Sequence, residues 1–96
     1  NVQANEVSTA LELCKPIHKL AETIMKRRQE GTSMAKMVEI ANSSDIGSLK
    51  VFANLLVEEA YSSPRYHTRE NQRRAVQDFG NENFKMCLDL MKENTK

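Results

Sequence analysis

The chain has 96 residues, of which 40% are hydrophobic and 28% charged, and its formal net charge is +1. This length predicts one domain, residues 1–96, and the composition is that of a globular chain rather than a disordered one. The balanced charge argues against a chain whose main ligand is a phosphate backbone or an anionic membrane, and no run of eighteen apolar residues is present to span a bilayer.

The spacing of the apolar residues predicts helices and no strands. The polar opening, residues 1–6, is expected to be frayed. A first helix is predicted from Val7 or Pro16 to Glu30, because Pro16 fits either the first turn of a helix or a kink within a longer one, and Gly31 is a residue that ends helices. Its apolar stripe is Ile17, Leu20, Ala21, Ile24 and Met25.

Two shorter helices are predicted next. Ser33 is the expected N-cap of the second, and its inner face comprises Met34, Met37, Val38 and Ala41. Asp45 is the expected N-cap of the third, which reaches Ser62 before Pro64 stops it. The third helix has the broadest apolar stripe, so we expect it to be the central one: Ile46, Leu49, Phe52, Ala53, Leu56, Val57 and Ala60.

Thr68 is the expected N-cap of a last helix that runs to about Glu93. Its stripe is Val76, Phe79, Asn83 or Phe84, Cys87, Leu88 and Met91. Gly80 lies on this face and indicates either the close approach of another backbone or a break into two helices at Gly80-Asn81. The predicted fold is therefore an all-α compact bundle of four to five short helices.

The two cysteines, Cys14 and Cys87, lie near opposite ends of the chain. We predict that they form a disulfide between the first and last helices, which would stabilise the fold by about 4 kcal/mol in the chain-entropy model. A redox-active bond is the alternative, and in a cytosolic protein the pair would stay reduced. Neither cysteine has a CxxC partner or a metal-ligand spacing to His18 or His67, so we predict no metal and no cofactor.

A candidate partner-binding surface surrounds the turn at Pro64. It combines aromatic residues with arginines, which suit protein interfaces, and its members are Tyr61, Arg65, Tyr66, His67, Arg69 and Arg73. The alternative is that the tyrosines cover the end of the core while the arginines pair with Glu58, Glu59 and Glu70.

A second basic run, Lys26-Arg27-Arg28-Gln29, offers guanidinium groups for phosphate, or simply complements the C-terminal end of the helix dipole. Together with Arg65, Arg69, Arg73 and Arg74 it supports an alternative function, a cytosolic phage-type protein that binds nucleic acid.

Catalysis is not expected. His18 and His67 are the only side chains that ordinarily titrate near neutrality, and Ser62 and Ser63 do not lie in a nucleophile-elbow sequence. The chain also lacks a Gly-rich phosphate loop and an HExxH motif. We predict that the protein is not an enzyme; a small enzyme is the third and least favoured function.

The arrangement of Cys14, Ile24-Met25, Arg28-Gln29-Glu30-Gly31, Ala60-Tyr61, Pro64-Arg65-Tyr66, Phe79 and Cys87 resembles small uncharacterised bacterial and prophage-encoded proteins. In those proteins a helical domain bracketed by two cysteines follows a secretion signal. The resemblance implies export and the Cys14–Cys87 bond, and it brings no activity. A first residue other than Met fits a processed secretory protein and fits a trimmed cytosolic chain equally well.

The function expected from these features is that of a small exported protein, periplasmic or secreted, that binds another protein as an inhibitor, immunity factor or chaperone does. The alternative location is the cytoplasm. The partner and the oligomeric state are not predicted.

Overall fold

Four helices make up the part of the chain that the computed structural model describes, which is the backbone of residues 2–94 and the side chains of residues 9–92. They are α1 (Val2–Glu30), α2 (Met34–Ser43), α3 (Leu49–Tyr61) and α4 (Arg69–Asn94). This confirms the predicted all-α bundle, with four helices rather than five.

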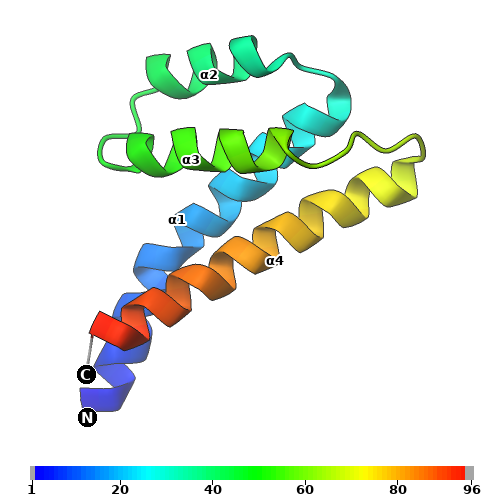
Figure 1. Ribbon diagram of the computed structural model, residues 1–96. Coiled ribbons are helices and arrows are strands. Elements are labelled where there is room, and N and C mark those ends of the chain that lie inside the picture. Colours follow the sequence, from blue (N-terminus) through cyan, green and yellow to red (C-terminus); the bar gives the residue numbers. More distant parts are fainter. Residues whose placement is uncertain (1, 95–96) are drawn as a thin grey trace.

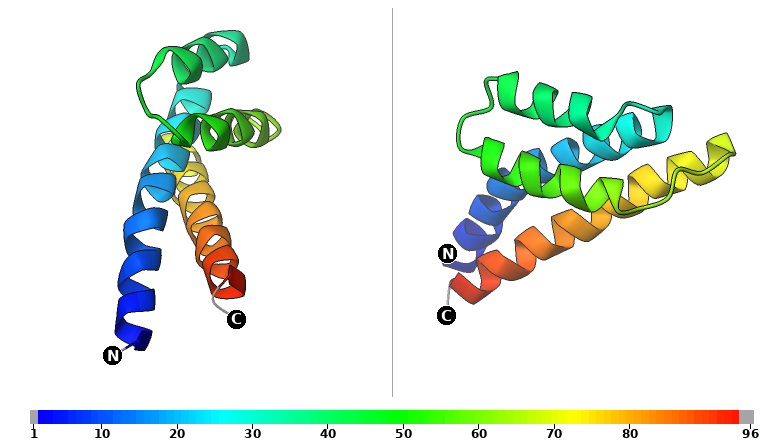
Figure 2. Two further views of the ribbon diagram at one scale, coloured as in Figure 1. Left: turned by 90° about the vertical axis from the view of Figure 1, so that its left-hand side faces the viewer. Right: turned by 45° about the horizontal axis from the view of Figure 1, so that its top comes forward.

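The two long helices form one layer and the two short helices form a second. α1 and α4 run antiparallel, so that both ends of the chain lie together, while α2 and α3 form a hairpin across the other half of the pair (Figure 1). Seen from the side, the hairpin projects from one side of the pair (Figure 2). The Cα atoms extend over 47 × 30 × 16 Å.

Length explains why the hairpin covers only half of the long pair. At 1.5 Å per residue, α1 is about 44 Å long and α3 only about 20 Å. One side of the layer formed by α1 and α4 is therefore covered near the turn between α3 and α4, and uncovered near the ends of the chain (Figure 1).

A disulfide closes the uncovered half. Cys14 of α1 and Cys87 of α4 are bonded, with their Cα atoms 5.6 Å apart. Cys14 is fully buried. The predicted bond between the first and last helices is thus present.

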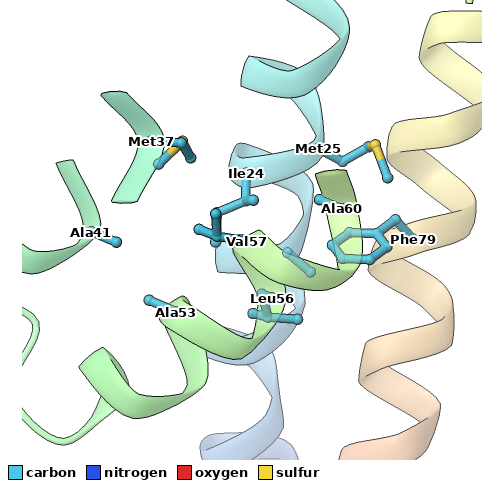
Figure 3. Close-up of a cluster of buried hydrophobic side chains, with 10 residues drawn as sticks. Ile24, Met25, Met37, Ala41, Ala53, Leu56, Val57, Ala60 and Phe79 are labelled. Atoms are coloured by element: carbon cyan, nitrogen blue, oxygen red, sulfur yellow. The ribbon is translucent and has the colours of Figure 1, made fainter. Parts of the chain in front are cut away.

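The core lies where the two layers meet. Ile24 and Met25 of α1 are buried with Val57 of α3 and Phe79 of α4 (Figure 3). The remaining members of this cluster are Ala21, Met37, Ala41, Ala53, Leu56 and Ala60. α1 packs against each of the other three helices. The prediction that the third helix is central is therefore wrong: its stripe is broad, but it is the long first helix that every other helix contacts.

The predicted signals at three helix ends are confirmed. The Ser33 hydroxyl accepts a hydrogen bond from the Lys36 backbone NH and caps α2. Gly31 adopts φ +96°, and the NH groups of Gly31 and Thr32 donate to the Arg28 and Arg27 carbonyls, which is a Schellman motif. The Thr68 hydroxyl accepts from the Asn71 NH at the start of α4.

Other helix starts differ from expectation. α3 begins at Leu49, not after Asp45, because Gly47 has φ +58° and forms a separate turn over residues 46–49. α1 is helical from Val2, so residues 2–6, expected to be frayed, belong to it, and it continues through Pro16; Asn1 lies outside the described residues. Met34, expected on the inner face of α2, is exposed, because α2 packs against the core through Met37 and Ala41 instead.

Gly80 lies inside a continuous α4 rather than at a break. A Cβ at this position would lie 2.6 Å from Glu22 Cγ and 3.2 Å from His18 Nε2. α1 therefore approaches Gly80 closely, but the prediction of another backbone there is wrong, because the nearest atoms belong to side chains of α1.

Candidate protein-binding surface

The predicted turn is tied to the end of α1. Arg28 donates two hydrogen bonds, from Nε and from one terminal nitrogen, to the Ser63 carbonyl at 3.2 Å. Its guanidinium also lies 5.1 Å from the centre of the Tyr61 ring, a cation–π distance. Arg28 lies in the last turn of α1, as the helix-dipole interpretation expects, and its side chain also positions the turn that follows α3.

Gln29 is the centre of this connection. Its side chain is 2% exposed, donates to the Pro64 carbonyl at 3.0 Å and accepts from the Tyr66 NH at 2.8 Å. Arg65 Nε in turn donates to the Gln29 carbonyl at 2.9 Å. Sequence reasoning missed Gln29, because a polar residue at the end of a charged run carries no signal that it is buried.

Tyr61 also faces inward. Its hydroxyl donates to the Thr32 carbonyl at 2.6 Å, beyond the end of α1. Burial raises the pKa of Tyr61, while the charges of Arg28 and Arg27 oppose this increase. The hydroxyl thus stays protonated and donating across the neutral range.

Two of the six candidate residues, Tyr61 and Arg65, therefore direct their polar groups to hydrogen bonds within the chain. The expected pairing of arginines with acidic residues is present only in part: Arg74 lies 3.3 Å from Glu70, and no ion pair joins Arg65 to a carboxylate among the described side chains. The other candidates, Tyr66, His67, Arg69 and Arg73, are exposed.

The structure brings together residues of two basic stretches that are far apart in the sequence. Lys26 of α1 meets Arg69 and Arg73 of α4 around an open depression of about 280 Å³, which is also lined by Gln29, Glu30, Gln72 and Val76. A second depression, of about 450 Å³, lies on α1 alone and is lined by Thr23, Lys26, Arg27 and Glu30. Arg65 and Arg74 do not line the first depression.

The two histidines lie in different places. His18 stands on α1 with Nδ1 3.8 Å from Glu22 Oε1 and its ring edge-on to Phe84, while His67 is exposed in the turn before α4. Among the described side chains, no cluster of three His, Cys, Asp or Glu residues is placed to hold a metal ion. None of the helices described offers the long apolar stretch that crossing a bilayer requires.

A different surface lies at the disulfide end, and its residues are spaced along two apolar stripes. On α1 the stripe is Leu13, Ile17, Leu20 and Ile24; on α4 it is Phe79, Met86 and Leu90, with the polar Asn83 lying in the same row. Steps of seven and eleven residues return to within about 20° of the same direction on a helix. Leu13, Met86 and Leu90 therefore point to the side on which Ile24 and Phe79 meet α3.

The two ends of these stripes differ in burial. Ile24 and Phe79 belong to the core beneath α3, whereas Leu13, Met86 and Leu90 are at least half exposed, because the short hairpin does not reach them. We call these three residues the apolar face. No motif in the sequence marks these three residues.

α3 adds three more exposed apolar side chains, Val51, Phe52 and Leu55. The expectation that Phe52 is part of the core is wrong, because α3 contacts the rest of the molecule through Ala53, Leu56, Val57 and Ala60. Phe52 lies one turn before Leu56, which belongs to the same buried cluster as Phe79. We call Val51, Phe52 and Leu55 the α3 patch.

Comparison with models of known protein families, with curated proteins and with solved structures finds no match for this chain.

Proposed function

We propose that this protein acts by binding another protein, in the periplasm or after secretion, in the manner of an inhibitor, immunity factor or chaperone. The observation that carries the proposal is the exposure of six large apolar side chains on the apolar face and the α3 patch. Each is between 47% and 68% exposed. Single exposed apolar residues are common on any protein surface, but clusters of them mark interaction sites.

The pattern of the exposed residues supports a partner rather than chance exposure. Leu13, Met86 and Leu90 continue stripes whose other members are buried or, in the case of Leu20, partly buried, and the α3 patch lies within two turns of one helix. Covering such side chains removes apolar area from water, which contributes about 25 cal/mol per Å².

The disulfide supports the proposed location. Cys14–Cys87 joins the two helices that carry the apolar face. Disulfides form and persist in oxidising compartments such as the periplasm and the extracellular space.

The test is cross-linking followed by measured affinity. A photoreactive residue at position 86, in protein kept oxidised in an extract of its native compartment, should cross-link one protein that mass spectrometry identifies. With that protein purified, the double variant Met86→Gln/Leu90→Gln should bind at least about tenfold more weakly.

The matched control is the double variant Arg69→Ala/Arg73→Ala, at the other end of α4, which should bind as the unchanged chain does. If this control loses affinity and the apolar variant keeps it, the turn predicted from sequence is the binding surface and the apolar face is not. If neither change alters the binding of any cross-linked protein, the proposal is wrong.

A second candidate function, nucleic-acid binding, is favoured by one observation: Lys26, Arg69 and Arg73 surround the same depression. Binding through these cations would weaken steeply as salt rises. A filter-binding assay with single- and double-stranded RNA and DNA tests it, and no retention at low salt would remove this candidate.

A further inference from the structure

We infer that the apolar face receives an amphipathic helix of the partner, and that this helix carries Lys or Arg beside its apolar stripe. The inference rests on the proposed function and specifies the chemistry of the partner. It follows from the geometry of the apolar face and from the charges that surround it.

The geometry is that of a site for a second helix beside α3. The eleven residues from Leu13 to Ile24 span about 16 Å along α1. Packed helices lie about 8–10 Å apart, so two helices fit side by side across this length. α3 occupies the position over the buried Ile24 and Phe79, whereas Leu13, Met86 and Leu90 are exposed and their position is uncovered.

The uncovered position offers a partner helix the same kind of apolar surface, formed by α1 and α4 together, on which α3 packs at the occupied position. In both, an apolar residue of α1 lies on the same side as an apolar residue of α4, and the disulfide fixes the two helices to each other. An amphipathic helix that lays its apolar side on such a surface is a recurring mode of peptide recognition. Phe52, exposed on α3 one turn from the buried Leu56, supplies apolar contact on that helix.

The charged side chains one helical turn from these residues have one sign. Residues three or four apart on a helix are neighbours. Of the described side chains that stand in this relation to the six exposed apolar residues, four are carboxylates and none is Lys or Arg; the carboxylates are Glu58 and Glu59 beside Leu55, and Glu82 and Asp89 beside Met86.

Most of this negative charge is not neutralised within the chain. Asp89 pairs with Lys85 at 2.7 Å, whereas Glu58, Glu59 and Glu82 form no ion pair among the described residues. A helix with Lys or Arg beside its apolar stripe would supply the missing partners. A second copy of this chain would bring the same carboxylates into contact, and like charges across an interface oppose association.

The experiment uses three synthetic helices of about 20 residues, long enough to be helical in water. They share one apolar stripe and differ only in the flanking positions, which are Lys, Gln or Glu. Binding to the oxidised full chain is measured by fluorescence anisotropy. We expect the Lys helix to bind at least about tenfold tighter than the Glu helix, and the difference to shrink as salt is added.

Two variants locate the effect. Met86→Gln should weaken binding of all three helices, because it removes apolar contact from an exposed position without opening the core. Glu82→Gln should reduce the preference for Lys over Glu, while Asp78→Asn, an exposed carboxylate on the same helix that does not lie one turn from the six residues, should leave the preference unchanged. Circular dichroism checks that each variant keeps its helical signal.

The outcomes separate this inference from the proposed function. If the Glu helix binds as tightly as the Lys helix, or if sedimentation shows a dimer that Leu90→Gln disrupts, the inference is wrong while a protein-binding role stands. If no helix binds but Met86→Gln still weakens a cross-linked native partner, the inference alone again fails. If no helix binds and Met86→Gln alters nothing, both are refuted.

Discussion

The two ends of the α1–α4 pair differ in what holds them together and in which side chains they expose to water. At the turn end, Arg28, Gln29, Tyr61 and Arg65 satisfy the backbone carbonyls of residues 29, 32, 63 and 64. At the disulfide end, one covalent bond holds the helices, and apolar side chains such as Met86 and Leu90 are left in water. Aromatic and arginine residues near a turn thus do not by themselves mark a binding surface, because a turn that packs against a helix end needs side-chain donors for its own carbonyls.

The largest expected change in stability comes from breaking the covalent bond at the disulfide end. Reduction of Cys14–Cys87 should lower the free energy of unfolding by about 4 kcal/mol, since the bond closes a loop with a sequence separation of 73. Urea denaturation of the oxidised and reduced chains, followed by circular dichroism, measures the difference. Equal midpoints would show that the bond adds no stability and that the turn end alone holds the pair together.

The next largest loss of stability is expected at the turn end, where hydrogen bonds hold the chain together. Gln29→Leu keeps the size of the side chain but leaves the Pro64 carbonyl and the Tyr66 NH without their partner, which should cost about 2 kcal/mol. Arg73→Ala, an exposed neighbour of the same region, is the control and should change stability by less than about 0.5 kcal/mol. A neutral Gln29→Leu would mean that water replaces both bonds without loss.

A smaller change in stability, this time a gain, is expected from replacing Asn83, which lies on α4 between the two ends of the pair. Asn83 is 1% exposed, and its Oδ1 accepts no hydrogen bond, while Nδ2 donates to the Phe79 carbonyl. Asn83→Leu removes this unsatisfied oxygen and extends the apolar stripe of α4, so we expect about 1 kcal/mol of added stability. Asn81→Leu, on the exposed side of α4, is the control. A loss of stability in Asn83→Leu would contradict this account of Oδ1.

The smallest effect concerns pH at the disulfide end. The hydrogen bond from Lys85 lowers the pKa of Asp89 below its ordinary value, and the charges of Lys85 and Lys92 act in the same direction. A lowered pKa in the folded state adds stability above the ordinary pKa of an aspartate, and this is lost as pH falls through the lowered value. NMR titration of the Asp89 carboxyl should show its pKa rise in Lys85→Gln. An unchanged value would assign the shift to another cause.

Much of the fold followed from local signals. The Ser33 cap, the Gly31 terminus and the helical spacing of Ile17 to Met25 each depend on residues within a turn or two of one another. The failures were local as well: Asp45 resembles an N-cap, but Gly47 takes a left-handed conformation after it and delays α3 to Leu49. The pairing of Cys14 with Cys87 was predictable because no third cysteine competes.

The sequence by itself determined the all-helical class, the helix ends marked by Gly31, Ser33 and Thr68, and which two cysteines can pair, because these depend on neighbouring residues or on a single available pair. The tertiary structure decided which polar residues are used internally and which apolar residues remain exposed. Gln29 is buried because carbonyl and NH groups some 35 residues away meet it. Met86 and Leu90 are exposed because a 13-residue helix cannot cover a 26-residue one. Neither outcome is visible in the local pattern, since both depend on where another helix comes to lie.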